Sequence, residues 1–597
     1  MAASLSSLSA TAVPTETEIA SESAKANAFF DRAFDEGVAR SPMFMAQLGL
    51  KKDNDKWDDL SDAHALEDLV LTVQHLDELR RTIKFDALDE SAKVSYRMFV
   101  GDSERAIEGW RWRFHNYPLN QMSGLHSEAP ALLINYHQID TTDDARAYIA
   151  RLRGMKPLLD QQIEGIKIRA AKNIVPPKFV FPLVIDSARE VITGEPFDQT
   201  GKRCALLEDF ETKVTALKDA DTGTRKQLLA EARAALLEAV KPAYENLIAV
   251  LQAQEKSATT DDGVWKFPDG LEYYAFALRG STTTRMTADQ IHELGLKEVA
   301  RIHHDMEAIM AKVGFKGDLK AFFKFIREDP QFYYPTTLEG KAAYMKRANQ
   351  IIDDVRARLD EFFITKPKAP LLVKQVEPFR EQGAAAAFYE QPAPDGSRPG
   401  VYYVNTVDMH GVPIFEMETL AHHEAIPGHH MQIAIAQELN GLPKFRRFGG
   451  NTAYDEGWAL YAEYFPKEFG FYQDPYQDFG RLYDELLRAV RLVVDTGIHA
   501  RRWTREQVMD YFRQNTPEPE RDIFTETNRY IVNPAQATAY KIGMLKILEL
   551  RELAKKELGP KFQLREYHDL VLRDGAVPLD LLEENVKAWI AKKEIRP

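Results

Sequence analysis

The chain has 597 residues, of which 44% are hydrophobic and 28% are charged, and its net charge at pH 7 is −14. These values indicate a globular protein that is long enough to bury a large core, and the negative charge gives no support for nucleic-acid binding. No apolar run reaches the length of about 18 residues that a membrane span needs, so we expect no transmembrane segment. Cys204 is the only cysteine, which excludes an internal disulfide and a four-cysteine zinc site.

The N-terminal segment, residues 1–23, is rich in Ser, Ala and Thr and has neither a basic leader nor a continuous apolar stretch. It is therefore not an intact secretory signal. We interpret it as a disordered tail or as the remnant of a leader.

Helical periodicity dominates the rest of the chain, because apolar residues recur at three- and four-residue spacing with charged residues between them. We predict a mainly α fold with helices over 24–48, 62–83, 90–115, 143–172 and 224–255. Two capping boxes are expected to open helices, one formed by Thr224 with Gln227 and the other by Thr287 with Gln290.

Polar or Pro/Gly-rich breaks interrupt the helical pattern at 194–196, 257–263, 366–370 and 391–396. The break before residue 264 is the predicted boundary between a helical N-terminal lobe, 24–263, and a catalytic lobe, 264–597. The alternative is one continuous domain over 24–597. All candidate catalytic residues follow residue 263, so we expect the N-terminal helices to form a wall of a deep cleft.

Residues 400–406 contain β-branched and aromatic side chains and predict a strand of a small β-sheet. An exposed edge of this strand would pair with an extended peptide substrate. The alternative is a covered strand or hairpin that binds no ligand.

Four histidines and one carboxylate lie within residues 420–430, namely His422, His423, Glu424, His429 and His430. Imidazoles are preferred zinc ligands, and a carboxylate beside a ligand histidine can activate water. This composition predicts a site for one zinc ion. The alternative is a polar helix face that binds no metal.

The spacing of these histidines needs a distorted helix. His423 and His429 are six positions apart, and in a regular helix such residues diverge by about 120° and lie about 9 Å apart along the axis. Pro427 and Gly428 favour a bulge that would bring the two imidazoles together. We therefore predict His423 and His429 as zinc ligands and Glu424 as the general base.

The other two histidines of the block, His422 and His430, are predicted to have structural or supporting roles around the metal site. A third protein ligand is expected downstream, where Gly457 would let two helices approach closely. Glu456 is our choice for this ligand. Asp455 and Glu463 are the alternatives, and for each of them a capping or solvated carboxylate is the simpler explanation.

Residues 423–430, HEAIPGHH, and residues 455–463, DEGWALYAE, resemble the bacterial family known as domain of unknown function 885. Similar blocks occur at 491–499, 529–530 and 534–543 and in the ending from 567–569 through 575–579, and the resemblance covers nearly the whole chain beyond its first twenty or so residues. It implies a thermolysin-like zinc peptidase catalytic region with a glutamate as third ligand. Asp455 stands where zinc aminopeptidases have asparagine, so the resemblance does not support aminopeptidase specificity.

The matching blocks also suggest residues that act on substrate. Tyr540 is the first candidate for stabilising the oxyanion, and His499, Arg529 and Tyr530 are further candidates. A structural role is the alternative for each of these four. Asp495 is expected either to orient a ligand histidine or to form an ordinary buried salt bridge.

Together these patterns predict a zinc metallopeptidase that hydrolyses short peptides with metal-activated water and Glu424 as base. A zinc amidohydrolase acting on a non-peptide amide and a metal-free binding or scaffold protein are the alternatives. Relatives in the resembling family often carry export signals, which favours a periplasmic or secreted location over the cytoplasm.

Overall fold

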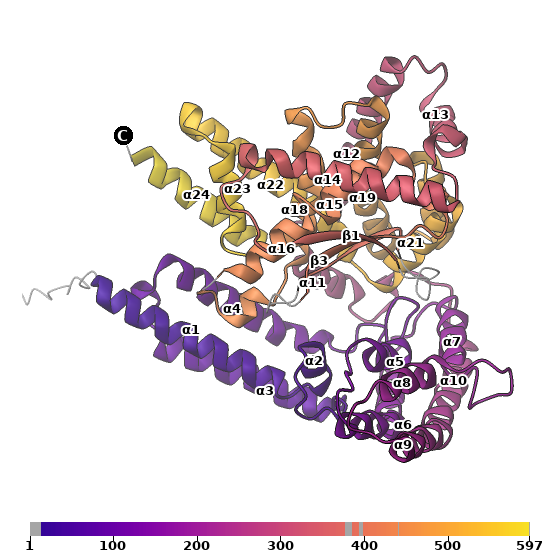
Figure 1. Ribbon diagram of the computed structural model, residues 1–597. Helices are drawn as coiled ribbons and strands as arrows, with labels where there is room; N and C mark the ends of the chain where they lie inside the picture. Colours follow the sequence, from indigo (N-terminus) through magenta and orange to yellow (C-terminus); the bar gives the residue numbers. More distant parts are fainter. Residues whose placement is uncertain (1–13, 377–384, 393–397, 440, 596–597) are drawn as a thin grey trace, which may run out of the picture.

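The protein is described by a computed structural model over residues 14–376, 385–392, 398–439 and 441–595. It is mainly helical with a small sheet, as predicted (Figure 1). Among these residues no helix is long and apolar enough to cross a membrane.

The helices of the N-terminal part are α1 (Glu16–Val38), α2 (Pro42–Gln47), α3 (Asp62–Thr82), α4 (Glu90–Gly109), α5 (Leu125–Asn135), α6 (Thr142–Ala171), α7 (Val180–Val191), α8 (Ala205–Thr215), α9 (Thr222–Ala235), α10 (Lys241–Glu255) and α11 (Gly270–Thr282). The later helices are α12 (Ala288–Lys312), α13 (Leu319–Glu328), α14 (Leu338–Phe362), α15 (Met417–Glu424), α16 (His429–Glu438), α17 (Lys444–Arg447), α18 (Thr452–Tyr464), α19 (Pro475–Arg501), α20 (Arg505–Asn515), α21 (Glu520–Val532), α22 (Ala539–Leu558), α23 (Leu564–Leu572) and α24 (Leu579–Ile595).

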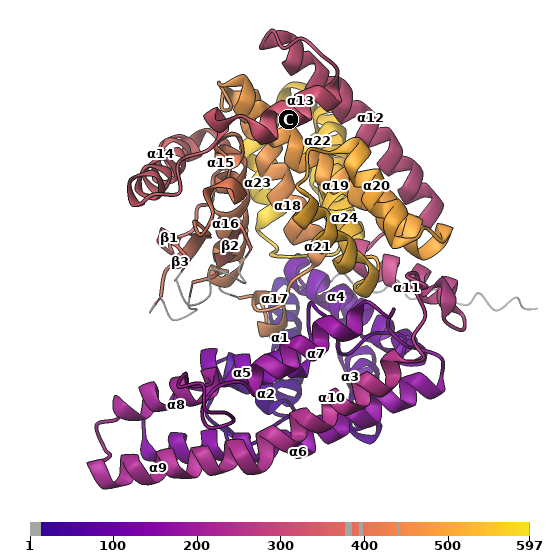
Figure 2. The same ribbon diagram turned by 90° about the vertical axis from the view of Figure 1, so that its right-hand side faces the viewer.

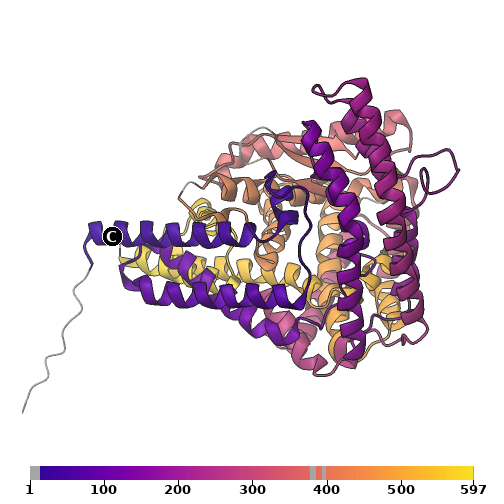
Figure 3. The ribbon, with the colours of Figure 1, turned by 90° about the horizontal axis from the view of Figure 1, so that it is seen from below.

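Most of the two groups of helices lie on opposite sides of the molecule. Helices α1–α10 lie below most of α12–α24 in Figure 1, and the turned view in Figure 2 shows the same separation. The short α17 lies beside α1, and α11 packs against α18, α19 and α22 of the later group. In the view from below, the later helices lie behind α1, α3 and the long helices α6 and α10 (Figure 3). One hydrophobic cluster nevertheless runs from Val94 to Ile590 and so contains residues of both groups. The lobe boundary between residues 263 and 264 stays a prediction.

Most predicted helices are confirmed. The stretches 62–83, 90–115 and 143–172 correspond to α3, α4 and α6, and a short π-helical segment at Leu236–Val240 joins α9 to α10 over the predicted 224–255. Thr287 and Gln290 form the expected capping box of α12. The box predicted at Thr224 is wrong, because α9 begins earlier and Asp221 accepts the hydrogen bond from the Thr224 N–H.

The N-terminal segment differs from the prediction. Residues 1–13 lie outside the described part, but α1 begins at Glu16 and is opened by a capping box between Thr15 and Glu18. Ser23 is buried and its hydroxyl accepts a hydrogen bond from the Asp89 N–H. The prediction of a disordered tail that extends to residue 23 is therefore wrong. Apolar side chains are few there, but polar caps and a buried serine stabilise a helix.

The described sheet has three strands, β1 (Leu371–Gln375), β2 (Ala387–Glu390) and β3 (Gly400–Val404), in the order β1-β3-β2. The strand predicted over 400–406 is confirmed as β3, which pairs in parallel with β1 and antiparallel with β2. The prediction that this strand has an exposed edge is wrong, because β3 lies between the other two strands and all of its residues are buried. The edge nearer the site is formed by β2.

Four helices, α15, α18, α19 and α22, build the scaffold of the histidine block. Gly457 of α18 and Gly543 of α22 meet so closely that a Cβ on Gly457 would lie 2.5 Å from the Gly543 Cα. The close approach predicted at Gly457 therefore exists, but it is directed at α22 and not at the histidine helices. Because α19 is buried along most of its length and α15 packs against both α18 and α19, the site rests on fixed elements.

Candidate metal centre and its cavity

The histidine block forms two helices joined by a tight turn. Helix α15 ends at Glu424 and α16 begins at His429, so the single bulged helix that we predicted is wrong. The backbone leaves the helical region at Ala425, the residue after the end of α15, where φ is −104° and ψ is −111°. A Cβ on Gly428 would lie 1.9 Å from the His423 carbonyl oxygen, so only glycine fits. The Trp458 Nε1–H donates to the Pro427 carbonyl at 2.9 Å and fixes the turn.

This turn brings the two predicted histidine ligands together. The ring centroids of His423 and His429 are 4.8 Å apart, and the rings are inclined at 88°. The Glu456 Oε2 atom lies 3.7 Å from Nε2 of each histidine. Among the described residues, these three are the one group of at least three His, Cys, Asp or Glu side chains whose ligand atoms all lie within 4.8 Å of one another.

The separation of the Glu456 oxygen from each imidazole nitrogen suits a zinc ion. Ligands at about 2.0–2.1 Å in a tetrahedral arrangement are separated by about 3.4 Å, close to the two measured distances. Burial lowers the pKa of His423 to about 4 and also lowers the pKa of His429, so both imidazoles are neutral near pH 7. Neutral imidazole is the form that binds metal.

Glu463 determines which nitrogen of His423 faces the site. Its Oε1 atom lies 2.6 Å from His423 Nδ1, and its side chain is only 2% exposed. Nε2 of His423 is therefore the nitrogen directed at Glu456. Glu463 is thus neither a solvated carboxylate nor one of the three converging ligand candidates. It instead holds the ring of a candidate ligand histidine, which is the orienting role that the sequence suggested for Asp495.

Asp495 does not reach the histidines. Its carboxylate accepts hydrogen bonds from the Tyr274 hydroxyl and from the Ala535 N–H. Burial raises the pKa of Asp495 to about 7. Among the described residues, neither of the roles that we predicted for Asp495 is found: it contacts no ligand histidine and forms no salt bridge, and instead it holds the turn that precedes α22.

Asp455 also points away from the three converging side chains. Its Oδ2 atom accepts a hydrogen bond from the Asn451 N–H at 2.8 Å, so it stabilises the first turn of α18. This is the capping role that was the simpler explanation for this residue. Burial raises its pKa to about 7.

The remaining two histidines of the block connect it to the surrounding structure. Nδ1 of His422 contacts the Tyr472 hydroxyl at 2.8 Å, and that hydroxyl donates to the Glu463 carbonyl oxygen. His430 contacts Tyr389 of β2 through Nδ1 and the Ala369 carbonyl through Nε2. Both histidines therefore have supporting positions.

Glu424 faces a cavity of about 400 Å³. The walls come from the segment leading into β2 and from α15, α19 and α21, and they include Ala387, Arg488, Arg491, Glu526 and Arg529. Burial raises the pKa of Glu424 to about 7, an effect that His429 opposes and Glu456 reinforces. This carboxylate can therefore accept a proton near neutral pH.

Tyr540 belongs to a cluster of arginines at the wall of this cavity. Its ring lies against the guanidinium of Arg491, with 4.7 Å between Cζ and the ring centroid. Arg529 donates to the Tyr540 hydroxyl at 3.1 Å and also pairs with Glu526. The Tyr530 hydroxyl contacts Arg491 and Glu526 and is buried among them. Tyr540, Arg529 and Tyr530 are thus brought together.

His499 does not join them. It is fully buried, its Nδ1 accepts a hydrogen bond from the Val264 N–H, and its Nε2 contacts the Tyr530 carbonyl oxygen at 3.0 Å. Because both ring nitrogens are occupied by backbone groups, a role for His499 in the oxyanion site or in substrate binding is wrong.

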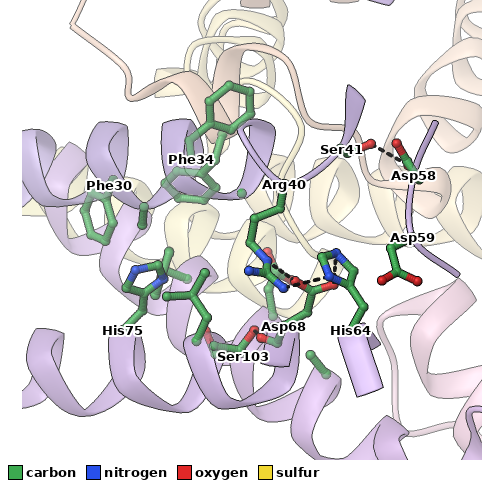
Figure 4. A pocket seen from close by; sticks show the side chains of 18 of the residues that line it. Phe30, Phe34, Arg40, Ser41, Asp58, Asp59, His64, Asp68, His75 and Ser103 are labelled. Atoms are coloured by element: carbon green, nitrogen blue, oxygen red, sulfur yellow. Dashed lines mark hydrogen bonds and ion pairs between the residues drawn. The ribbon is translucent and has the colours of Figure 1, made fainter. Parts of the chain in front are cut away.

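A second cavity, of about 490 Å³, lies among α1, α3 and α4 and contains none of these residues (Figure 4). Its polar side chains pair with one another: Arg40 pairs with Asp68 and contacts His64, and the Ser41 hydroxyl donates to Asp58. The candidate residues Glu424 and Arg529 line the first cavity, and among the described residues no candidate site residue lines the second one.

Sequence reasoning missed the roles of Trp458, Arg488, Arg491 and Glu526. A usable signal was present on α19, where charged residues recur every three or four positions among apolar neighbours: Arg481, Asp484, Glu485, Arg488, Arg491 and Asp495. Such a stripe is expected on a helix that turns one polar face toward a cavity or a buried network. No comparable signal marked Trp458.

Over residues 42–586 the sequence matches the family described as bacterial protein of unknown function (DUF885). A solved structure named "putative lipoprotein" from Colwellia psychrerythraea is 33% identical, with a TM-score of 0.88, and the match covers 96% of this chain and 99% of that one. A second, from Shewanella oneidensis, is 19% identical with a TM-score of 0.73, and the match covers 93% of this chain and 98% of that one. At this identity the second match shows the fold alone. No curated protein shows significant similarity to the chain.

Proposed function

The chain belongs to this DUF885 family of bacterial proteins, and we propose that it is a zinc metallopeptidase that hydrolyses short peptides. The observation that carries the proposal is the convergence of His423, His429 and Glu456 next to Glu424. Two neutral imidazoles and one carboxylate are the ligand set of thermolysin-like zinc peptidases, and such a set leaves one zinc position open. We therefore retain the resemblance to that clan as part of the proposal.

A zinc ion at this site supplies Lewis acidity, which makes a nearby water more acidic and polarises the carbonyl group of the substrate. Glu463 keeps His423 in the orientation that such an ion needs, because it holds the opposite ring nitrogen. Gly428 and Trp458 keep the two histidine helices at their present separation.

Glu424 is the proposed general base. It follows His423 directly and faces the cavity, and its raised pKa suits a group that takes up and releases a proton near neutrality. It accepts a proton as water attacks the carbonyl carbon, and it delivers that proton to the leaving nitrogen as the C–N bond breaks.

Tyr540 is the proposed oxyanion donor. Because Arg529 donates to the Tyr540 oxygen, the hydroxyl proton of Tyr540 stays available for a substrate oxygen. The adjacent Arg491 guanidinium favours negative charge in the same region.

The segment Ala385–Ala387 borders the cavity where it enters β2, and β2 lies at the edge of the described sheet. We propose that an extended peptide follows this segment toward Glu424, in place of the β3 edge expected from the sequence. The deep cleft remains part of the proposal: the cavity of about 400 Å³ at Glu424 would admit short chains and exclude folded proteins.

A zinc amidohydrolase acting on a non-peptide amide is the second candidate, since the same base and ligands would cleave that bond. We propose a periplasmic or secreted location, with the cytoplasm as the alternative. The similar chain from Colwellia psychrerythraea, which is named "putative lipoprotein", supports the extracytoplasmic location.

The proposal is tested by metal analysis together with hydrolysis of short peptides and of non-peptide amides. We expect one zinc ion per chain, peptide hydrolysis that a chelator abolishes, and loss of both in His429→Ala. His304→Ala changes an exposed histidine of α12 and is the matched control. A wild-type protein without stoichiometric zinc would instead support the metal-free binding or scaffold protein.

A further inference from the structure

The arginines beside Glu424 carry more positive charge than their neighbours neutralise. Arg491 and Arg529 both pair with the Glu526 carboxylate, so two permanent positive charges share one negative charge. Arg491 lines the cavity although its side chain is only 6% exposed. A buried guanidinium cannot shed its proton, so this surplus charge persists at any working pH.

Arg491 also has an unused donor. Its Nε atom donates to the Tyr530 hydroxyl and, with Nη2, to Glu526, whereas Nη1 has no hydrogen-bond partner among the described residues. Nε of Arg488, which lines the same cavity, is likewise buried without a described partner. An unsatisfied buried donor on a charged group is costly, and an anionic ligand would satisfy it.

Carboxylates also line the cavity, and they offer a different ligand, an amine. Asp484 pairs with Arg488, but Glu416, Glu518 and Asp522 have no arginine partner in the described structure. Burial raises the pKa of all three carboxyl groups, so these groups can take a proton and become neutral. The arginines keep their positive charge, whereas these carboxylates can become neutral. The cavity therefore favours an anionic ligand over an amine.

We propose that Arg491 and Arg529 bind the free C-terminal carboxylate of the substrate, so that the enzyme trims short peptides from their carboxyl end. The proposal rests on the proposed peptidase function and specifies its substrate class. A carboxylate bound at the Arg491 guanidinium would lie beside Tyr540, whose ring contacts that guanidinium. The peptide bond nearest the carboxyl end is then the one that is presented to Glu424 and Tyr540.

The test uses acetylated tripeptides that are identical except for a C-terminal carboxylate or carboxamide, together with their unacetylated forms. We expect kcat/KM for the acid to exceed that for the amide about 100-fold, because a charge-assisted bond to a buried arginine is lost in the amide. Acetylation should change kcat/KM by less than about threefold. Equal rates for acid and amide, or a requirement for a free amino terminus, would overturn the proposal.

Binding separates this inference from the peptidase function. Titration calorimetry of the acid and amide peptides with Glu424→Gln measures affinity without turnover, and we expect the acid to bind at least about 30-fold more tightly. If the wild type cleaves neither peptide while this preference holds, the peptidase function fails and the carboxylate site stands. If both peptides are cleaved and bound equally, the carboxylate site fails and the peptidase function stands.

In Arg491→Gln the acid-to-amide ratio should fall to about one, and in Arg529→Gln it should fall less because that side chain is more exposed. Arg513→Gln removes a surface arginine of α20 that pairs with Glu520, and it should keep the wild-type ratio. If Arg491→Gln does not fold, the acid and amide comparison in the wild-type protein still decides the proposal.

Discussion

The Glu463 carboxylate lies 2.6 Å from Nδ1 of His423. The other nitrogen of that ring, Nε2, faces Glu456. Glu456 and Glu463 are seven residues apart on α18, so two helical turns place both carboxylates on one face of the helix. One helix therefore supplies a candidate metal ligand and the group that orients another ligand.

Glu463→Gln should weaken zinc binding by about 10- to 100-fold while the fold is kept, since an outer carboxylate raises ligand basicity and fixes the ring. Competition with a fluorescent chelator measures the affinity. Glu506→Gln, at an exposed position of α20, is the matched control. Unchanged affinity in Glu463→Gln would mean that the contact with His423 does not serve a metal site.

Glu424→Gln should retain zinc and lose about 10³-fold in kcat, because glutamine fills the same space and cannot accept the proton. Metal content and peptide hydrolysis are measured on the same preparation. Substantial activity in the zinc-loaded variant would remove Glu424 from the mechanism.

Tyr540→Phe removes the proposed oxyanion donor and leaves the ring against Arg491. We expect kcat to fall about 10²-fold with little change in KM, since the lost hydrogen bond forms in the transition state. Steady-state kinetics on one peptide decides this. A rise in KM at constant kcat would instead assign Tyr540 to ground-state binding.

Gly428→Ala should destabilise the protein by about 3 kcal/mol, because the new Cβ would collide with the backbone carbonyl of His423 and no flexible side chain can move away. Urea unfolding measures the loss, and zinc binding should fall with it. Gly411→Ala is the control, since nothing lies within 4 Å of a Cβ there. Equal stability of the two variants would contradict the observed turn.

The histidine block could be predicted because its chemistry is local. His423, Glu424 and His429 lie within seven residues, and the Pro427–Gly428 pair made a break in the helix necessary. Glu456 came from the resemblance and from its position beside Gly457. The exact form of the turn was not accessible, because it depends on Trp458, which is distant in sequence and donates to the Pro427 carbonyl.

The partners of buried charges could not be predicted, because they come from different helices. Asp495 was expected to orient a histidine or to form a salt bridge, and only the packing of α11 and α22 around α19 shows that it contacts Tyr274 and the Ala535 N–H. Position along the chain could not separate Tyr540, which reaches the cavity cluster, from His499, whose two ring nitrogens contact backbone groups. The local sequence pattern thus predicts which segments form helices or strands. Tertiary contacts determine which role each candidate site residue has.

Asp495→Asn should make stability less dependent on pH. Burial raises the pKa of Asp495 from 3.8 to about 7 in the folded protein. The proton bound to this carboxyl group therefore stabilises the folded protein fully below about pH 4. This contribution is lost as the pH rises through about 7. A shift of about three pKa units corresponds to about 4 kcal/mol. The free energy of unfolding of the wild type, relative to that of Asp495→Asn, should therefore fall by about this amount between about pH 4 and pH 8, as measured by urea unfolding at several pH values. A difference that does not vary with pH would show that Asp495 is already ionised in the folded protein at about pH 4, and its hydrogen bonds from Tyr274 and Ala535 would then outweigh the effect of burial.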